Sequence, residues 1–331
     1  MKSLKLKLAV LGTLGLASAQ VMAGWVVNLP AAGYSVTGGT TAYTLCNPTG
    51  NFGSGLPIKA TPGVNDDCAV FPTTETTAPD STYPSNPVFS TSQAINMNNT
   101  YTNNTTIRVG TLTQYLWRKT IGSGSSATYE CIYGTKIVLN GNDYNLQAAG
   151  TQNFEVNDIA VGGFGGKTID VAYSTIPTVS EPVYRVGRTF TAVQHRGTGS
   201  TPAPGYVARP LTTPAFSGSI NGVNSWSSTL PVPTAAQQSA SLNDNWVNFT
   251  TDVNFLDDDG STSAASGMVY VRTSCSSTNP TVVANAVRLR QTFQELSGDG
   301  VTNNWFIEVP VNGFLPTLGS GVVTPTPSSP F

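Results

Sequence analysis

The chain has 331 residues, of which 39% are apolar and 10% are charged, and its formal net charge is −2. Acidic residues outnumber Lys and Arg by 18 to 16, which excludes the basic surface on which nucleic-acid binding depends. An aromatic content of 9% excludes a disordered chain, and so few charges among many Thr, Ser, Asn and Gly residues are typical of extracellular β-proteins.

Residues 1–23 have the three parts of a bacterial-type secretory signal peptide. Three lysines come first, the apolar run 8–19 follows, and small residues precede a cleavage point after Ala23, or alternatively after Ala19. The apolar run is shorter than the ~20 residues that a membrane-spanning helix needs, so we expect cleavage rather than a retained anchor. The mature protein is therefore expected outside the cell or at its surface, with the periplasm as the alternative, and without a membrane span.

Residues 24–104 are rich in Gly, Pro and Asn and predict an irregular region of long loops and short strands. The chain has four cysteines, and an even number in an exported protein predicts two disulfides. Three pairings are possible. We favour Cys46–Cys68, which flanks one turn-rich stretch, together with Cys131–Cys275. A four-thiolate metal site would need closely spaced pairs such as C-x₂-C, and the sequence has none.

Residues 105–318 predict an all-β core, an antiparallel β-sandwich or jelly-roll-like fold, with a closed barrel as the less favoured alternative. The expected strands lie at 106–119, 129–139, 144–146, 154–161, 168–173, 183–193, 246–256, 268–273, 282–293 and 305–311. The Asn140-Gly141 pair indicates a hairpin turn. Residues 197–214 predict a long loop or a domain joint, residues 233–242 a short helix, and residues 319–331 a flexible tail.

The clearest strand pattern covers residues 246–256. Val247 and Phe249 alternate with Asn248 and Thr250, as in an antiparallel strand with one face in the core and one in water. An acidic turn interrupts the pattern before residues 268–273 resume it, so these two strands are expected to form a hairpin with a long tip.

The same acidic turn is a candidate calcium site. Asp257, Asp258 and Asp259, with Asp252 on the preceding strand, supply the hard oxygen ligands that Ca²⁺ prefers. A complete EF-hand loop would need Glu at its twelfth position, where Met268 stands. The alternative is a solvated acidic turn, and no other cofactor is indicated.

No catalytic motif is complete, which favours a protein that is not an enzyme. His195 is the one histidine, and the G-x-S-x-G elbow of many serine hydrolases is absent. The glycine-rich run 162–168 lacks the first glycine of a phosphate-binding loop. No spacing singles out a glycosidase pair among the scattered glutamates Glu130, Glu155, Glu181, Glu295 and Glu308.

The sequence therefore predicts a secreted or cell-surface structural or adhesive protein, such as a matrix, adhesin or filament subunit. Self-association through edge strands is expected, with residues 24–41 as a free strand that could complete a neighbour's sheet. The alternative is an extracellular carbohydrate-binding or polysaccharide-processing protein, in which exposed tryptophans would stack on glycans; core packing is the default for Trp246 and Trp305. A hydrolase that uses His195 is the third possibility.

Overall fold

The computed structural model describes residues 24–36, 39–46, 68–174, 176, 182–190, 192–194, 207–209, 223–226, 242–256, 263–291 and 304–316. The expected signal peptide, the tail and nearly all of the expected helix lie outside these ranges. Within the described part, no helix has the length and apolar character needed to cross a membrane.

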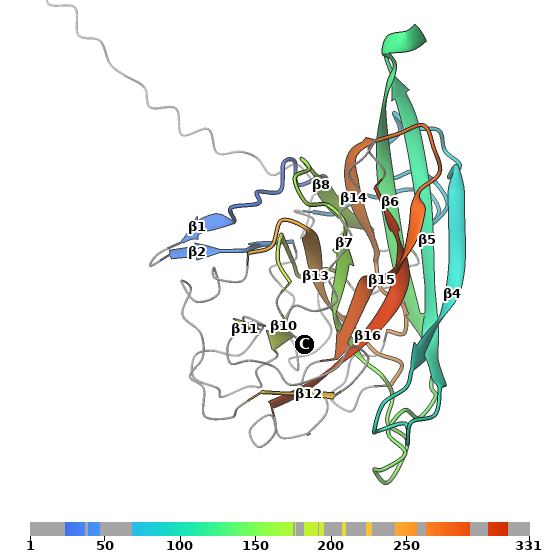
Figure 1. The fold of residues 1–331 in the computed structure, drawn as a ribbon, viewed down its shortest axis with the longest axis vertical. Coiled ribbons are helices and arrows are strands. Elements are labelled where there is room, and N and C mark those ends of the chain that lie inside the picture. Colours follow the sequence, from blue (N-terminus) through green and yellow to red (C-terminus); the bar gives the residue numbers. More distant parts are fainter. Residues whose placement is uncertain are drawn as a thin grey trace, which may run out of the picture.

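Two antiparallel sheets face each other as an all-β sandwich (Figure 1). The five-stranded sheet has the order β4-β5-β6-β14-β8 and the seven-stranded sheet the order β12-β16-β15-β7-β13-β9-β3. The strands of the first are β4 (Phe89–Met97), β5 (Ile107–Ile121), β6 (Thr128–Leu139), β8 (Asp170–Ser174) and β14 (Met268–Cys275). Those of the second are β3 (Tyr43–Leu45), β7 (Val156–Gly162), β9 (Arg185–Gly187), β12 (Val223–Trp226), β13 (Trp246–Val253), β15 (Thr281–Gln291) and β16 (Asn304–Leu315).

Smaller elements complete the described structure. Two short hairpins stand apart from the main sheets: β1 (Tyr34–Val36) with β2 (Gly39–Thr41), and β10 (Ala192–Gln194) with β11 (Val207–Arg209). The β5–β6 hairpin extends beyond the rest of its sheet, with the 3-10 turn η1 (Gly124–Ser126) at its tip (Figure 1). Strands β3 and β4 come from the region expected to be irregular, so that region contributes to both sheets.

The main core lies between the sheets and follows from the alternation of side chains along each strand. Leu112, Leu116 and Val271 of the five-stranded sheet are fully buried, as are Ile159 and Leu289 of the facing sheet. Burying an aliphatic side chain of this size stabilises the fold by about 1.5–3 kcal/mol. The core is therefore the main source of stability for the sandwich.

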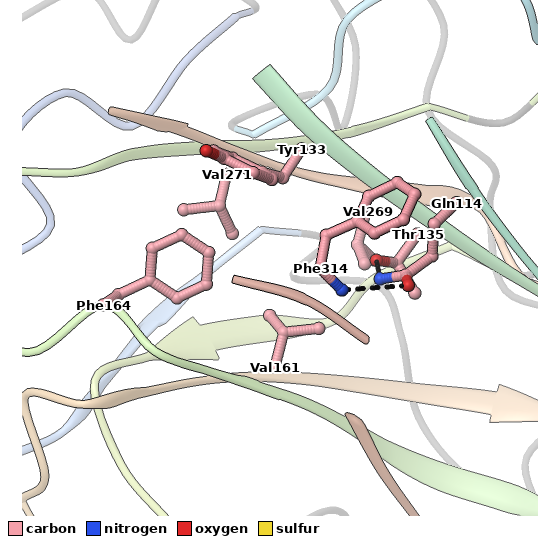
Figure 2. Close-up of a pocket in the computed structure, with 8 residues that line it drawn as sticks. All are labelled: Gln114, Tyr133, Thr135, Val161, Phe164, Val269, Val271 and Phe314. Atoms are coloured by element: carbon pink, nitrogen blue, oxygen red, sulfur yellow. Dashed lines mark hydrogen bonds between the residues drawn. The ribbon is translucent and has the colours of Figure 1, made fainter. Parts of the chain in front are cut away.

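One polar group crosses this core. The amide nitrogen of Gln114 donates to the hydroxyl of Thr135 at 3.0 Å, and the amide oxygen accepts from the backbone N–H of Phe314 at 3.2 Å (Figure 2). The second bond joins β5 to β16 across the two sheets. The cavity beside these residues measures about 10 Å³, room for about one water molecule, so it is a packing gap rather than a ligand site.

Two expected hairpins do not form. β13 and β14 lie in different sheets, because β14 pairs with β6 and β8 while β13 pairs with β7 and β9. The Asn140-Gly141 pair ends β6 without starting a partner strand; instead the side chain of Asn140 accepts the N–H of Asn142 at 3.1 Å. The strand expected at 144–146 is therefore absent. The hairpin partner of β6 is instead the preceding strand, β5.

The expected exposure of β13 is also wrong. Every residue of β13 is buried, including Asn248, Thr250 and Asp252 on the face assigned to water. The period-two pattern marks the two faces correctly, but it cannot tell water from a second protein layer. Both faces of the seven-stranded sheet are covered at this strand.

A third layer covers the outer face of the five-stranded sheet, the face that points away from the seven-stranded sheet. The covering loop, residues 69–88, and the N-terminal segment, residues 24–30, lie on or beside this face. They pack with a second apolar cluster formed by Val70, Ala78, Tyr83, Trp117, Ile132, Ala172, Met268 and Tyr270. Gly134 leaves room for the ring of Trp117, since a Cβ at position 134 would lie 2.8 Å from that ring.

Candidate functional site

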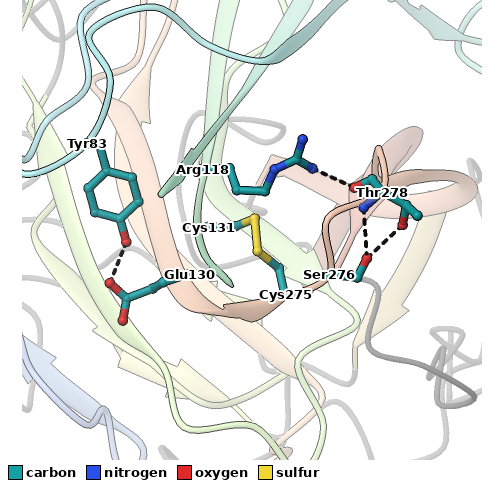
Figure 3. Close-up of a disulfide and its surroundings, with 7 residues drawn as sticks. All are labelled: Tyr83, Arg118, Glu130, Cys131, Cys275, Ser276 and Thr278. Atoms are coloured by element: carbon teal, nitrogen blue, oxygen red, sulfur yellow. Dashed lines mark hydrogen bonds between the residues drawn. A yellow bond between two sulfur atoms is a disulfide. The ribbon is translucent and has the colours of Figure 1, made fainter. Parts of the chain in front are cut away.

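The four cysteines form two disulfides in the pairing favoured from the sequence. Cys46 bonds to Cys68, with 4.9 Å between the Cα atoms, and Cys131 bonds to Cys275, with 5.8 Å. The second bond joins β6 to β14 diagonally, because Cys131 pairs in register with Thr273 rather than with Cys275 (Figure 3). The first fixes the start of the covering loop to the end of β3. Both bonds are structural clamps, and the described residues contain no free cysteine.

Of the four candidate calcium ligands, Asp252 alone lies within the described residues. Asp252 is 4% exposed and lies within β13, on the outer face of the seven-stranded sheet. Asp257, Asp258 and Asp259 lie outside the described residues. Within the described ranges, no group of three or more His, Cys, Asp or Glu side chains could hold a metal ion.

The candidate catalytic residues are dispersed where the structure describes them. Glu155 and Glu308 are buried, and Glu130 lies on the outer face of the five-stranded sheet. His195, Glu181 and Glu295 fall outside the described ranges. The glycine-rich run begins at the end of β7, where Phe164 is buried and Arg188 donates to its carbonyl oxygen at 2.8 Å. That carbonyl–arginine contact supports a structural turn rather than a phosphate-binding loop.

Two of the tryptophans are too buried to stack on a sugar, as was expected for Trp246. Trp117 and Trp246 are 0% and 2% exposed. The indole nitrogen of Trp117 points toward the carbonyl oxygens of Thr76 and Ser85, at 3.3 and 3.1 Å, so this side chain anchors the covering loop. The side chains of Trp226 and Trp305 lie outside the description.

A row of four charged side chains and one threonine crosses the outer face of the seven-stranded sheet. The strand register aligns Glu308, Arg290, Asp158, Thr250 and Arg185 across β16, β15, β7, β13 and β9. Cross-strand neighbours in register have Cβ atoms about 5 Å apart, so opposite charges in this row attract each other. The first four of these residues are fully buried. Sequence patterns gave no signal for this row, because polar residues on one face of a strand usually indicate solvent.

The carboxylate of Glu308 is held by two arginines. One oxygen accepts from Arg288 and the other from Arg290, the latter at 3.0 Å, and none of these three side chains is exposed. The guanidinium of Arg290 lies 4.4 Å from the centre of the Phe190 ring, and that ring packs against Trp246. Burial lowers the pKa of Arg288, and the attraction of Glu308 acts against that shift. With both oxygens engaged and no exposed surface, Glu308 serves as an ion-pair partner rather than as a group that reaches a substrate.

The covering loop is pinned to the five-stranded sheet by ionic and hydrogen bonds. Arg272 of β14 contacts Asp80 of the loop at 2.8 Å and Asp170 of β8 at 2.6 Å, and its guanidinium lies 4.4 Å from the centre of the Trp25 ring. The hydroxyl of Tyr83 donates to Glu130 at 2.6 Å (Figure 3). Burial and this bond raise the pKa of Tyr83 well above its ordinary value. The loop is therefore held in one shape without regular secondary structure.

The fixed loop encloses a pocket of about 370 Å³. Its walls are Phe71, Pro72, Thr73, Thr77, Ala78, Pro79, Asp80, Ser81, Tyr83 and Ser85. No lysine or arginine lines it, and its one charged group, Asp80, already accepts from Thr82 and from Arg272. Sequence analysis did not find this pocket, because residues that line a loop in this way have no periodic pattern.

Strand β4 leaves one long edge of the five-stranded sheet open. Among the described residues β4 pairs with β5 alone, and its outward side chains Ser90, Ser92, Ala94 and Asn96 are exposed. All nine residues of β4 are uncharged and none is proline. Natural edge strands are usually protected by charge, proline, shortness or a cover. A register irregularity between Ile95 and Asn96 is the one such device here, and it leaves residues 89–95 regularly paired.

The other sheet edges are short or covered. β3 and β12 have three and four residues. β8 is covered by the N-terminal segment, since Val26 exchanges two backbone hydrogen bonds with Val171 at 2.8 and 3.0 Å, and Ala69 bridges to Tyr173. Residues 24–41 are thus not a free strand, because their first part covers β8 and Tyr34–Val36 and Gly39–Thr41 form a hairpin.

Comparison with known proteins gives no further guide to the site. No protein family model, curated protein or solved structure matches the chain.

Proposed function

We propose that the protein is a secreted or cell-surface structural or adhesive subunit that pairs with a second copy of itself through β4. The observation that carries this proposal is the uncharged edge of β4, with which no described strand pairs on its outer side. The two disulfides support an oxidising, extracytoplasmic location. The absence of a catalytic constellation among the described residues leaves this edge as the feature that most needs a partner.

The sequence of β4 suits pairing with its own copy. If two strands align antiparallel about Ser92, Phe89 faces Ile95 on the inner side and Ser90 faces Ala94 on the outer side. An aromatic residue opposite a β-branched one is a favourable cross-strand pair, worth roughly 0.2–1 kcal/mol. No charged residue meets another in any register, because the strand has none. The result is a two-fold dimer with a continuous ten-stranded sheet.

The inner face of β4 is already fixed for such pairing. The ring of Phe89 packs against Phe314 of β16 with 5.3 Å between ring centres, and the side chain of Gln93 donates to the backbone oxygen of Asn312 at 2.6 Å. Ile95 and Met97 are fully buried. The strand is held extended before it meets a partner, which reduces the conformational entropy lost on binding.

The direct test is a charge at the centre of the proposed two-fold axis. In Ser92→Lys, two lysines would face each other across the dimer, whereas each lysine would be exposed in the monomer. We expect the mature chain to sediment as a dimer and Ser92→Lys as a monomer, with partial recovery of the dimer at high salt. The matched control is Ser125→Lys, which places the same charge on the exposed turn beyond β5.

A covalent version gives a positive signal. A cysteine at the two-fold centre would face its copy at a Cα separation of about 4.5–5.5 Å, within the range that disulfides span. Ser92→Cys should therefore form a disulfide-linked dimer on oxidation, and Ser125→Cys should not. A wild-type chain that stays monomeric at every concentration, or a Ser92→Lys variant that stays dimeric, would contradict the proposal.

A further inference from the structure

The pocket formed by the covering loop has features of a binding site that the assembly proposal does not use. The loop that forms it has no regular structure, yet four contacts with the sheet fix its shape. Trp117 bonds to two of its carbonyl groups, Arg272 to Asp80, and Tyr83 to Glu130, while Lys136 pairs with Glu75. A pocket fixed in this way loses little entropy when a ligand binds.

The lining combines apolar surfaces with neutral hydroxyl groups. Phe71 is 39% exposed, and Pro72 and Pro79 extend the apolar wall. Thr73, Ser81 and Ser85 are exposed residues with hydroxyl groups, and that of Thr73 donates to Thr77 at 3.2 Å and can still accept. An open volume of about 370 Å³ lies within the range of small-ligand pockets.

The charges restrict the ligand. An anionic ligand would meet no cation in the lining and would be repelled by Asp80. A cationic ligand or a metal ion would have to displace Arg272 and Thr82, which already donate to the two oxygens of that carboxylate. A neutral ligand with both apolar faces and hydroxyl groups fits the remaining chemistry.

We propose that this pocket binds one sugar unit of a neutral glycan. The ring of Phe71 would lie against the apolar face of the sugar, and the hydroxyls of Thr73, Ser81 and Ser85 would bond to its hydroxyl groups. Binding in this pocket does not depend on pairing through β4, since the pocket and β4 do not share a residue.

The experiment is a screen of neutral and acidic glycans on an array, followed by titration calorimetry with the best neutral glycan. It is run on the mature wild type and on Ser92→Lys, so that failure to assemble and failure to bind sugar are read separately. We expect the same affinity in both proteins. Phe71→Ala should weaken binding about tenfold through loss of the aromatic contact, and Ser81→Trp should abolish it by filling the pocket.

Val88→Ala is the matched control, because Val88 is exposed to a similar degree, 42%, and does not line the pocket. It should bind as the wild type does, and circular dichroism should show all variants folded. The proposal is overturned if no neutral glycan binds at millimolar concentration, if acidic glycans bind better than neutral ones, or if Ser81→Trp binds unchanged.

Discussion

At the residue scale, the buried ion pairs between Glu308 and its two arginines should contribute strongly to stability. Glu308→Gln would leave Arg288 fully buried without the carboxylate that it contacts, and would remove one partner of Arg290. Breaking a buried ion pair from one side costs about 3–5 kcal/mol, because an uncompensated charge stays in the interior. We expect a loss of that size in the free energy of unfolding, measured by urea denaturation of the mature chain.

Glu130→Gln is the comparison for this prediction. Glu130 also pairs with a cation, Lys119, at 2.7 Å, but the two side chains are 28% and 24% exposed. Exposed ion pairs are worth about 0–1 kcal/mol, so this variant should change stability little. Equal losses in the two variants would show that burial does not set the contribution of Glu308.

Lys136 gives a prediction for alkaline pH. Its side chain is 5% exposed, and burial lowers the pKa of its ammonium from 10.5 to about 8, although Glu75 contacts it. Between pH 8 and 10.5 the unfolded chain then carries more of this proton than the folded chain does. The free energy of unfolding must therefore rise with pH across that window, because stability increases with pH wherever the unfolded state binds more protons than the folded state.

The measurement is the difference in unfolding free energy between the wild type and Lys136→Met at several pH values. The variant cannot ionise at this position, so it should lack this part of the rise. A difference that stays constant from pH 7 to pH 11 would mean that the folded pKa of Lys136 is the ordinary one for lysine, about 10.4.

At the scale of elements, the two disulfides should contribute unequally to stability. Cys131–Cys275 closes a loop with a sequence separation of 144, and Cys46–Cys68 one of 22. In the chain-entropy model the longer loop contributes about 5 kcal/mol and the shorter about 3 kcal/mol. Replacing both Cys131 and Cys275 with alanine should therefore lower the melting temperature more than replacing both Cys46 and Cys68. The opposite order would contradict this account.

The sequence predicts strands far better than it predicts their partners. Periodicity located β5, β6, β7, β8, β13, β14, β15 and β16 to within a few residues, because alternation is a local property. It paired β13 with β14 because they are neighbours in the chain. In the structure, one bridge between Asn254 and Ser263 starts such a hairpin before the strands separate into different sheets. That choice depends on contacts with β6 and β7, which no local pattern contains.

The two candidate sites differ in how far the sequence could have found them. Residues 89–97 contain no charged residue and no proline, so an unprotected edge strand was visible once its place in the sheet was known. The pocket was not visible, because it depends on Trp117 and Arg272, which are distant in sequence from the loop that they hold. Long-range anchors of this kind leave no spacing to recognise.

At the scale of the whole molecule, composition and alternation predicted the all-β class of the fold. They did not predict that the covering loop and the N-terminal segment form a third layer on the five-stranded sheet. The charged face of the seven-stranded sheet and the aromatic outer face of the other sheet are both covered. A polar residue on a strand face was therefore a poor guide to solvent. Tertiary covering, rather than propensity, decided the exposure of Asn248 and Thr250.

The N-terminal segment should control how many copies can join. Deleting residues 24–30 removes Val26 and Trp25 and uncovers the part of β8 around Val171, while Ala69 stays bridged to Tyr173, so the five-stranded sheet gains a second, shorter open edge. A subunit with one open edge closes into a pair, whereas one with two open edges can continue indefinitely. We expect the truncated chain to form polymers visible by negative-stain electron microscopy. A truncated chain that remains a dimer would refute this role.

Arg272 also bears on the order in which the molecule can mature. Its side chain contacts Asp170 and Asp80, which lie 102 and 192 positions earlier in the chain, and the still more distant Trp25. Synthesis delivers the N-terminus first, so Trp25 and Asp80 emerge long before the guanidinium that fixes them. Contacts between such distant positions form slowly. The N-terminal segment and the covering loop must therefore remain without this anchor until β14 has been synthesised, and this delay is when protection by a chaperone would matter most.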